Sequence, residues 1–453
     1  MLCLRKCLRR PILLLAIALT GIVCFLIYRI NHILEVRAYF ANTVESVGAT
    51  LSDIASKTTH ADRASEFDAL IEKLTTPLHS GAELSGATRE EGLRAYARFM
   101  DQPIDEPKGT PLVRPGTDAA GKAPATILCL VRNKDLEGIR SSITELEKAF
   151  NGKFKYPYTF LNDEPFTPEF KEAIQKLIPE HESEFATIDK EFWSIPEAIN
   201  REKYDVQKLK LLTLKVGHAE EDSYHLMCRF YSRYFYKVPE LAKYRYVWRL
   251  EPNVNFHSEL NYDVFQFMKA ANKIYGFTIS LYDNPWSVES LWDHTMDFVR
   301  AHPHYLNQAG ATDWLRENIQ KSENFKITRG YSTCHFWSNF EIIDLEFLRS
   351  EAYEQFVEYL DQTGGFFYER WGDAPVRSLA LALFANASDI HWFRDIAYNH
   401  LPYFNCPTFL PDSRRSFGTC KSGKFSNWDE LNVENCAGNW ILHAMTDADR
   451  AAY

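Results

Sequence analysis

The sequence predicts an α/β fold with a mainly parallel central sheet, and the stretch after residue 125 carries most of that prediction. Residues 126–131, Thr-Ile-Leu-Cys-Leu-Val, form a short apolar run typical of a strand buried on both faces. After Asp135, which can cap a helix, apolar residues recur at three- and four-residue steps as far as Phe150. A second strand is expected at 158–161, so the order strand, helix, strand indicates a βαβ unit with parallel strands.

Two later segments are also expected to form strands. Residues 243–251 are rich in aromatic and β-branched side chains and end before Pro252, which places Glu251 at the carboxyl end of that strand. Residues 275–281 have a similar composition, and the turn sequence Asp283-Asn-Pro follows them. Because ligands of open α/β sheets bind at the carboxyl ends of strands, Glu251 is a candidate binding residue.

Length and charge limit the classes of protein that fit. The chain has 453 residues, enough for a large buried core, and α/β enzymes of this size often fold as one unit. Its formal net charge is -10 and its pI is about 5.8. Nucleic acids and anionic membrane surfaces require a basic protein face, so these values argue against both as partners.

The N-terminus predicts an uncleaved membrane anchor. The uncharged run 11–28 suffices for a short span, whereas a cleaved signal peptide has a shorter apolar core and small residues at its cut site. Four basic residues precede this run and only Arg29 closely follows it, so the tail should stay cytosolic. We therefore expect a type II arrangement: a cytosolic tail (1–10), a transmembrane signal anchor (11–28), a stem with a Pro- and Gly-rich end (29–124) and a luminal domain (125–453).

The expected luminal part contains six of the nine cysteines. An even number in an oxidising compartment permits up to three disulfides, and the sequence cannot choose among the pairings. An N-glycosylation sequon stands at Asn386, and its use depends on exposure. The six cysteines are Cys129, Cys228, Cys334, Cys406, Cys420 and Cys436.

Four motifs carry a family resemblance. Three are dense aromatic blocks that each end near an ionisable residue: Tyr-Ser-Thr-Cys-His-Phe-Trp-Ser-Asn-Phe-Glu (331–341), Tyr-Glu-Arg-Trp-Gly-Asp-Ala-Pro (368–375) and His-Trp-Phe-Arg-Asp-Ile-Ala-Tyr-Asn-His (391–400). The fourth is Arg-Leu-Glu-Pro at 249–252. In this order they resemble the fungal glycosyltransferase family 15, Golgi α-1,2-mannosyltransferases that use GDP-mannose. The resemblance covers roughly residues 120–450.

The resemblance implies a GT-A type catalytic domain at 125–453 and a divalent cation, with manganese the expected ion. Glu251 and His400 match the metal-binding positions of the family motifs, and a carboxylate with an imidazole suits manganese. Sugar transfer leaves a diphosphate with growing negative charge, which a cation stabilises. Without the resemblance, Glu251 would be read as a solvated turn residue and His400 as a surface or core histidine.

Three more residues match catalytic positions of the family. Glu341 matches the proposed nucleophile of the family. Donor and product are both α-linked, so the stereochemistry is retained. Retention is compatible with a covalent sugar-enzyme intermediate and with same-face attack within an ion pair, and the sequence does not separate these two routes. Asp373 is expected to hold acceptor hydroxyls beside a sugar-stacking Trp371, although a turn aspartate and a core tryptophan are the simpler readings. The Tyr224 hydroxyl could contact acceptor or phosphate, or Tyr224 could be a buried structural residue.

Arg132 and Arg249 are candidates for donor binding. Arg132 follows the first expected strand, where the family places the guanine nucleotide, and a guanidinium offers a fixed fork of donors for phosphate. Arg249 shares a strand face with Glu251, so the two could instead form a structural ion pair.

Asn253 departs from the family pattern. Several relatives have Glu-Pro-Asp where this chain has Glu-Pro-Asn, and an amide brings no negative charge. We expect Asn253 to support the ribose or the water shell of the metal.

The resemblance thus implies a Golgi mannosyltransferase that binds GDP-mannose and a mannosylated glycan acceptor, and that contacts the lipid bilayer through one N-terminal span. Two alternatives stay open. One branch of the family is linked to transfer of mannose 1-phosphate, in which phosphorus is attacked. A catalytically silent glycan-binding subunit is the other, and only Asn253 favours it.

Overall fold

The computed structural model describes residues 60–76, 86–108, 121–179, 182–316, 322–411, 415–417 and 420–453. Its contacts divide the chain into two units, Met1–Ala69 and Leu70–Tyr453, and the first is described only over its last ten residues, which belong to helix α2 (His60–Thr75). The predicted tail and anchor lie outside the described residues. Within the ranges given, no helix is long and apolar enough to span a bilayer.

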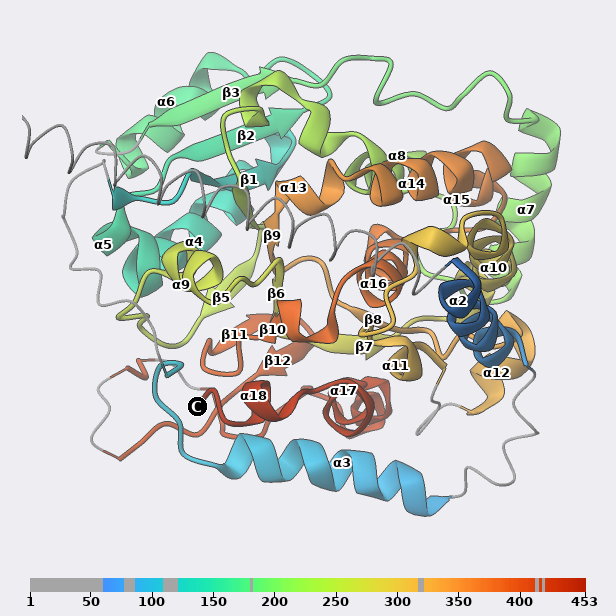
Figure 1. The fold of residues 1–453 in the computed structure, drawn as a ribbon. Coiled ribbons are helices and arrows are strands. Elements are labelled where there is room, and N and C mark those ends of the chain that lie inside the picture. Colours follow the sequence, from blue (N-terminus) through green and yellow to red (C-terminus); the bar gives the residue numbers. More distant parts are fainter. Residues whose placement is uncertain are drawn as a thin grey trace, which may run out of the picture. The chain divides into compact units, whose positions relative to one another are not determined.

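Seven strands of the described chain form the central sheet, in the order β10-β6-β9-β4-β1-β2-β3 (Figure 1). The pairs β1–β2, β1–β4, β2–β3 and β6–β10 are parallel, and β9 runs antiparallel between β4 and β6. The prediction of a mainly parallel central sheet is therefore confirmed. The strands are β1 (Ala125–Leu130), β2 (Tyr158–Asn162), β3 (Ser183–Thr187), β4 (Tyr246–Arg249), β6 (Tyr275–Phe277), β9 (Glu341–Asp344) and β10 (Ile390–Trp392).

The predicted βαβ unit is present. β1 and β2 are parallel neighbours, and the chain between them forms α4 (Leu136–Leu146), a π-helical turn η3 (Glu147–Asn151) and α5 (Gly152–Phe154). The apolar positions Ile139, Ile143 and Leu146 are buried. Asp135 precedes α4 but does not cap it, because its carboxylate accepts hydrogen bonds from Arg132 within η2 (Asn133–Asp135).

One predicted strand is divided between two sheets. The expected strand 275–281 covers β6 of the central sheet and the first two residues of β7 (Ser280–Tyr282), which pairs with β8 (Cys334–Phe336). The partner segment divides in the same way, since β8 and β9 are separated by 337–340, and the N–H of Trp337 donates to the Ile279 carbonyl at this bend (2.9 Å). An apolar composition alone therefore did not reveal the change of sheet.

A third sheet holds the end of the last motif. β11 (Tyr398–His400) lies between β12 (Tyr403–Asn405) and β5 (Val254–Phe256), antiparallel to both. β5 begins three residues after Glu251, and His400 pairs with Val254 in the register. This pairing brings two segments far apart in sequence to one place.

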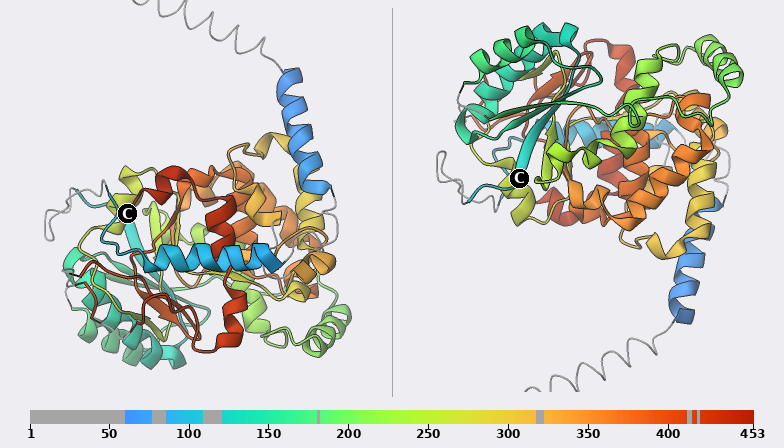
Figure 2. Two further views of the ribbon diagram at one scale, coloured as in Figure 1. Left: turned by 90° about the horizontal axis from the view of Figure 1, so that it is seen from below. Right: turned by 90° about the horizontal axis from the view of Figure 1, so that it is seen from above.

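Helices surround these sheets, and α8, α14, α15 and α16 pack against one another. In the view from below, α3 lies beside α17 (Figure 2). The helices are α3 (Gly86–Asp101), α6 (Pro168–Leu177), α7 (Arg201–Thr213), α8 (Asp222–Arg233), α9 (Val264–Ala270), α10 (Leu291–Ala301), α11 (Thr312–Arg316), α12 (Ser322–Thr328), α13 (Leu345–Leu348), α14 (Glu351–Thr363), α15 (Gly365–Tyr368), α16 (Asp373–Phe384), α17 (Ala437–His443) and α18 (Asp447–Arg450). Short 3-10 helices are η4 (Phe235–Lys237), η5 (Pro239–Leu241), η6 (Pro285–Ser287), η7 (Pro303–Tyr305), η8 (Ala387–Asp389) and η9 (Asp429–Glu434).

Helix α3 belongs to the compact unit although it precedes residue 125, where we placed the start of the luminal domain. Met100 is fully buried, and the ring of Tyr96 lies 6.1 Å from that of Trp392, centroid to centroid. A side chain at Gly438 of α17 would collide with the Gly92 carbonyl of α3, so a glycine lets the two backbones approach closely.

Two disulfides join four of the six cysteines in the described chain, Cys334–Cys436 and Cys406–Cys420. Cys129 and Cys228 are free and buried, so the third disulfide that the count permitted does not form. The first bridge ties β8 to the residue before α17.

At the N-glycosylation sequon, the side-chain amide of Asn386 is half-buried and donates a hydrogen bond to Asp389 (2.7 Å).

Candidate active site

A cavity of about 300 Å³ lies at the carboxyl ends of three parallel strands. Arg132 follows β1, Asn162 ends β2 and Glu251 lies just beyond β4, and all three side chains line it. This is where open α/β sheets bind ligands. Tyr231 and Trp193 add aromatic surface to the wall. The volume and the mixed polar and aromatic lining suit a small-molecule ligand.

A second cavity, of about 500 Å³, adjoins the first. Both cavities are lined by Tyr224, Met227, Glu251 and His400, so they meet at these four residues. The wall of the second cavity is rich in polar and aromatic groups: Arg249, Asp283, Asn284, His335, Trp337, Ser338, Asn339, Arg370, Asp373 and Tyr403. The arrangement provides two adjoining compartments with a shared boundary.

Glu251 and His400 face each other at that boundary. Glu251 Oε2 lies 3.7 Å from His400 Nε2, and both side chains are partly exposed. His400 Nδ1 lies 3.3 Å from the Leu401 carbonyl, which can only accept, so Nδ1 donates and a neutral imidazole directs its Nε2 lone pair toward Glu251. Two acceptors that face each other this closely repel unless a cation or proton lies between them.

This pair fits a divalent cation. Ligand bonds of about 2.1 Å place two ligands of one ion about 3.0–3.4 Å apart at angles of 90–110°, so a shift of a few tenths of an ångström would suffice. A metal-bound histidine usually donates its other N–H to a carbonyl, as His400 does here. No group of three or more His, Cys, Asp or Glu side chains suited to a metal exists within the described ranges. A cation here would need further ligands from a bound substrate and from water.

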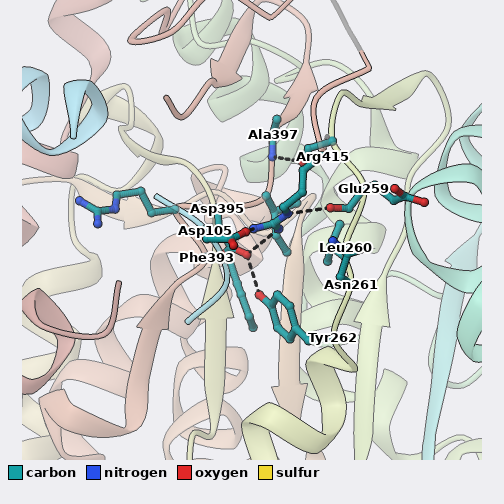
Figure 3. A network of polar contacts seen from close by, with 12 residues as sticks. Asp105, Glu259, Leu260, Asn261, Tyr262, Phe393, Asp395, Ala397 and Arg415 are labelled. Atoms are coloured by element: carbon teal, nitrogen blue, oxygen red, sulfur yellow. Dashed lines mark hydrogen bonds and ion pairs between the residues drawn. The ribbon is translucent and has the colours of Figure 1, made fainter. Parts of the chain in front are cut away.

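A buried network fixes the strands that carry these two residues (Figure 3). Arg415 is 2% exposed; its Nη2 lies 3.0 Å from Asp395 Oδ2 and its Nε donates to the Glu259 carbonyl (2.9 Å). Tyr262 also donates to Asp395 (3.0 Å). Asp395 lies just before β11 and Glu259 just after β5, so one guanidinium links the segments that place His400 and Glu251.

Arg249 forms ion pairs rather than projecting freely into a cavity. Its guanidinium is 3% exposed, donates to Glu251 and to Asp373 Oδ2 (2.7 Å), and stacks on the Tyr231 ring at 3.6 Å. Burial opposes its charge, but the surrounding carboxylates hold the pKa of Arg249 well above its usual value. The ion pair between Arg249 and Glu251 is present. The sequence left this pair open as the alternative to donor binding by Arg249. The pair holds the Glu251 carboxylate in place.

Glu341 lies in the core and does not line either cavity. It pairs with Arg249 in the β4–β9 register, is 1% exposed, and its Oε2 lies 3.4 Å from Arg377 Nε. Burial raises the pKa of Glu341, and the two arginines partly offset this. Its carboxylate is therefore buried beside Arg249 and is not at the surface of either cavity.

Asp373 is the first residue of α16 and lines the second cavity. It accepts hydrogen bonds from Arg249 and from the Ser338 hydroxyl (both 2.7 Å). Trp371, by contrast, is fully buried and its indole N–H donates to Glu369, so the simpler reading of a core residue applies. It offers no face to a sugar ring.

Tyr224 and Arg132 both line the first cavity. Tyr224 lines both cavities, and burial raises the pKa of its hydroxyl, which therefore stays protonated. Arg132 lines the first cavity with its side chain 52% exposed, and its Nε donates to Asp135 (3.0 Å). The exposed guanidinium retains donors for a ligand.

Asn253 does not line either cavity. Its φ is 63°, and its side-chain amide packs against Gly138 at the start of α4. The expectation that Asn253 supports a ribose or a metal-bound water is therefore not met by this arrangement. Asn adopts the left-handed backbone conformation more readily than most residues, so the local backbone accounts for an asparagine at position 253.

Several polar residues of the second cavity were not singled out from the sequence, among them Asp283, His335 and Arg370. His335 and Arg370 stand inside aromatic blocks, and an ionisable residue within an apolar block is a signal that could have found them. Asp283 was read only as a turn residue. Its place in a site depends on the pairing of β7 with β8, which the sequence did not reveal.

Comparison with known proteins identifies the family. The family model described as glycolipid 2-alpha-mannosyltransferase matches residues 91–445, well over half of the chain. The chain belongs to this family. The match begins within α3, in agreement with the packing of that helix against α17.

Relatives in the family are similar over most of the chain. The probable mannosyltransferase KTR4 of Saccharomyces cerevisiae is 50% identical over 449 residues, which cover 98% of this chain and 97% of that protein. The X-ray structure of S. cerevisiae Ktr4p in complex with GDP has a TM-score of 0.84 at 54% identity, and covers 86% of this chain and 100% of that one. The Mn/GDP form of core-mannan synthase A from Aspergillus fumigatus has a TM-score of 0.73 at 43% identity. The match covers 76% of this chain and 93% of that one.

Proposed function

We propose that this protein is a retaining mannosyltransferase that moves mannose from GDP-mannose to a mannose-terminated glycan in α-1,2 linkage. The observation that carries the proposal is the meeting of two cavities at Glu251 and His400, whose acceptor atoms face each other at 3.7 Å. The complexes of relatives with GDP and with Mn/GDP support the donor and the ion.

The first cavity is the donor compartment of this proposal. Arg132 presents guanidinium donors to the diphosphate, and Asp135 holds that side chain in place. Glu251 and His400 would hold Mn²⁺, with diphosphate oxygens and water as further ligands. When bound, the ion neutralises negative charge on the departing diphosphate. Arg249 keeps the Glu251 carboxylate oriented toward the boundary between the cavities.

The second cavity is the acceptor compartment. In the same-face route, the bond from the mannose C1 to the phosphate oxygen breaks, the acceptor oxygen bonds to C1 from the same side, and its proton passes to the departing phosphate. Asp373 and Tyr224 lie in the cavity wall, where they can hydrogen-bond acceptor hydroxyls. The burial of Glu341, which lines neither cavity, supports this route over a covalent intermediate.

The fold and location complete the proposal. The mixed, mainly parallel sheet supports a GT-A type catalytic domain. The basic tail followed by an uncharged apolar run supports a single-pass type II protein of the Golgi membrane, with the catalytic domain in the lumen.

Product analysis tests the function directly. Purified protein is incubated with GDP-mannose, Mn²⁺ and methyl α-mannoside, and the product is analysed for linkage and charge. A neutral α-1,2-linked disaccharide is expected. An acid-labile charged product would instead indicate mannose 1-phosphate transfer, and GDP binding without any product would indicate a silent glycan-binding subunit.

A further inference from the structure

A polar cluster in the second cavity lies apart from Glu251 and His400. Asp283 directly follows β7, His335 belongs to β8, and the register pairs Leu281 with His335. Arg370 lies between α15 and α16, and its Nη2 donates to Asp283 Oδ1 (3.0 Å). All three side chains line the cavity, and none of them has a role in the mechanism above.

Asp283 and Arg370 have hydrogen-bonding capacity that the described chain does not use. Arg370 is 7% exposed, and its buried Nε has no partner among the described residues. Asp283 Oδ1 accepts from Arg370 and from the Asn284 N–H (2.7 Å), whereas no contact of Oδ2 is found within the described ranges. The Arg370 Nε is shielded from the cavity, so the guanidinium nitrogen left for a ligand is Nη1, for which no hydrogen bond is found within the described ranges.

His335 adds an acceptor to the same wall. Its Nδ1 lies 3.1 Å from the Thr333 carbonyl, which can only accept, so Nδ1 carries the proton. Burial lowers the pKa of His335, which keeps the ring neutral and leaves Nε2 as an acceptor. For Nε2, too, the described part of the chain supplies no hydrogen-bond partner.

The chemistry of the cluster suits a neutral diol rather than an anion. The charge of Arg370 is already balanced by Asp283 at 3.0 Å, and the Asp283 carboxylate would repel a phosphate. A sugar hydroxyl donates one hydrogen bond and accepts others. Two adjacent hydroxyls can therefore donate to Asp283 and His335 while they accept from Arg370.

We propose that Asp283, Arg370 and His335 bind the 3- and 4-hydroxyls of the acceptor mannose, while its 2-hydroxyl receives the new sugar. This proposal rests on the proposed function. The 3- and 4-hydroxyls of mannose are adjacent and equatorial, so one planar Asp–Arg pair can contact both. The cluster then determines which sugar can serve as the acceptor.

Binding of acceptor analogues tests the proposal without any need for turnover. Methyl α-mannoside and its 3-deoxy and 4-deoxy analogues are titrated by NMR into the GDP-loaded protein and into Asp283→Asn. In the wild-type protein, each deoxy analogue should bind about tenfold to hundredfold more weakly than the parent, because a hydrogen bond to a charged group is lost. In Asp283→Asn, removal of the hydroxyl that donates to Asp283 should cost much less. Asp297→Asn, an exposed aspartate on α10, is the matched control and should behave as the wild type.

A second variant keeps the test valid if Asp283→Asn does not fold, which thermal unfolding would reveal. His335→Asn retains a donor toward the Thr333 carbonyl but lacks the Nε2 acceptor, and it should weaken discrimination against one of the two deoxy analogues. Equal losses for the deoxy analogues in wild type and variants, or no binding of methyl α-mannoside to the wild type, would overturn the proposal. Failure of the proposed function is distinct, since it would appear as binding without transfer.

Discussion

At the scale of single residues, Arg249 organises the candidate site. One buried guanidinium contacts the carboxylates of Glu251 and Asp373 and stacks on Tyr231, and Arg249 is the cross-strand partner of Glu341. The planar guanidinium holds its donors in fixed directions, so it can orient two carboxylates at once. The site is therefore pre-organised before any ligand binds.

Glu341 provides a prediction on the chemical route. If Glu341 acts through Arg249 and not as a nucleophile, a 2-fluoro analogue of GDP-mannose should leave no mannosyl adduct on the protein in intact-mass spectrometry. Glu341→Gln, which keeps the side-chain shape, should lower kcat while the KM for GDP-mannose changes little. Exposed Glu346→Gln is the control. An adduct mapped to Glu341 would contradict the same-face route.

Sequence reasoning reached part of the site at this scale. The strand end and the motif resemblance were enough to place Glu251, His400, Asp373, Tyr224 and Arg132 at the cavities. A core position for Trp371 was the simpler reading of the sequence, and the structure has it. The burial of Glu341 could not be predicted, because it depends on the pairing of β9 with β4, which has no local sequence signal.

At the scale of elements, the pairing of β5 with β11 sets the separation of Glu251 and His400. Asp395→Asn removes one charge from the Arg415–Asp395 pair, and a buried arginine without its partner costs about 3 kcal/mol or more of stability. Asp395 acts here as a positioning residue. We expect the variant to weaken Mn²⁺ binding while metal-free GDP binding changes little. The electron paramagnetic resonance signal of free Mn²⁺ measures the metal binding.

The control for this variant is Asp105→Asn. Asp105 also contacts Arg415, at 3.4 Å, but its side chain is 47% exposed. It should leave Mn²⁺ binding near the wild-type value. Equal losses of Mn²⁺ and of metal-free GDP binding in Asp395→Asn would point to general destabilisation and against a positioning role.

Helix α3 provides a second prediction about an element. Met100 is fully buried where α3 ends, so Met100→Ala should lower the free energy of unfolding by about 2–5 kcal/mol. Exposed Arg94→Ala on the same helix should cost far less. Denaturant titration of both variants measures the difference. Equal stability of the two variants would show that α3 does not contribute to the core.

Elements with regular apolar spacing were predictable, and elements defined by distant partners were not. The β1–α4–β2 unit follows from its own periodicity. The division of 275–281 follows from the pairing with β8, about 55 residues further along. Likewise, α3 has a mostly polar sequence, and only its contacts with α17 and Trp392 reveal that it belongs to the core.

At the scale of the whole molecule, buried histidines predict acid sensitivity. Burial holds the pKa of His391 well below its ordinary value of 6.5, and lowers those of His225 and His335. Below pH 6.5 the unfolded chain binds protons that the folded chain does not, so stability falls as the pH falls. His391→Gln should make this slope shallower by up to about 1.4 kcal/mol per pH unit.

Denaturant titrations across the acidic range measure this slope. His304→Gln, at an exposed position, serves as the control and should keep the wild-type slope. A slope for His391→Gln equal to that of the wild type would show that His391 does not remain neutral in the folded protein.

The two-compartment arrangement itself was beyond sequence reasoning. The walls of the second cavity come from α8, the β7–β8 sheet, the start of α16 and the β11–β12 segment, which are spread over nearly 180 residues. Composition and periodicity predict which strands exist, but not which loops share a cavity. The family resemblance supplied residues, and only the fold shows how they divide between two compartments.

The central claim is that Glu251 and His400 share a cation that strengthens nucleotide binding, and GDP titration by calorimetry with and without Mn²⁺ tests it most directly. In the wild type and in exposed Glu164→Gln, Mn²⁺ should tighten GDP binding by about tenfold or more, whereas Glu251→Gln and His400→Ala should each lose most of that gain. If Mn²⁺ tightens GDP binding equally in all four proteins, the two side chains do not hold the ion and the account is wrong.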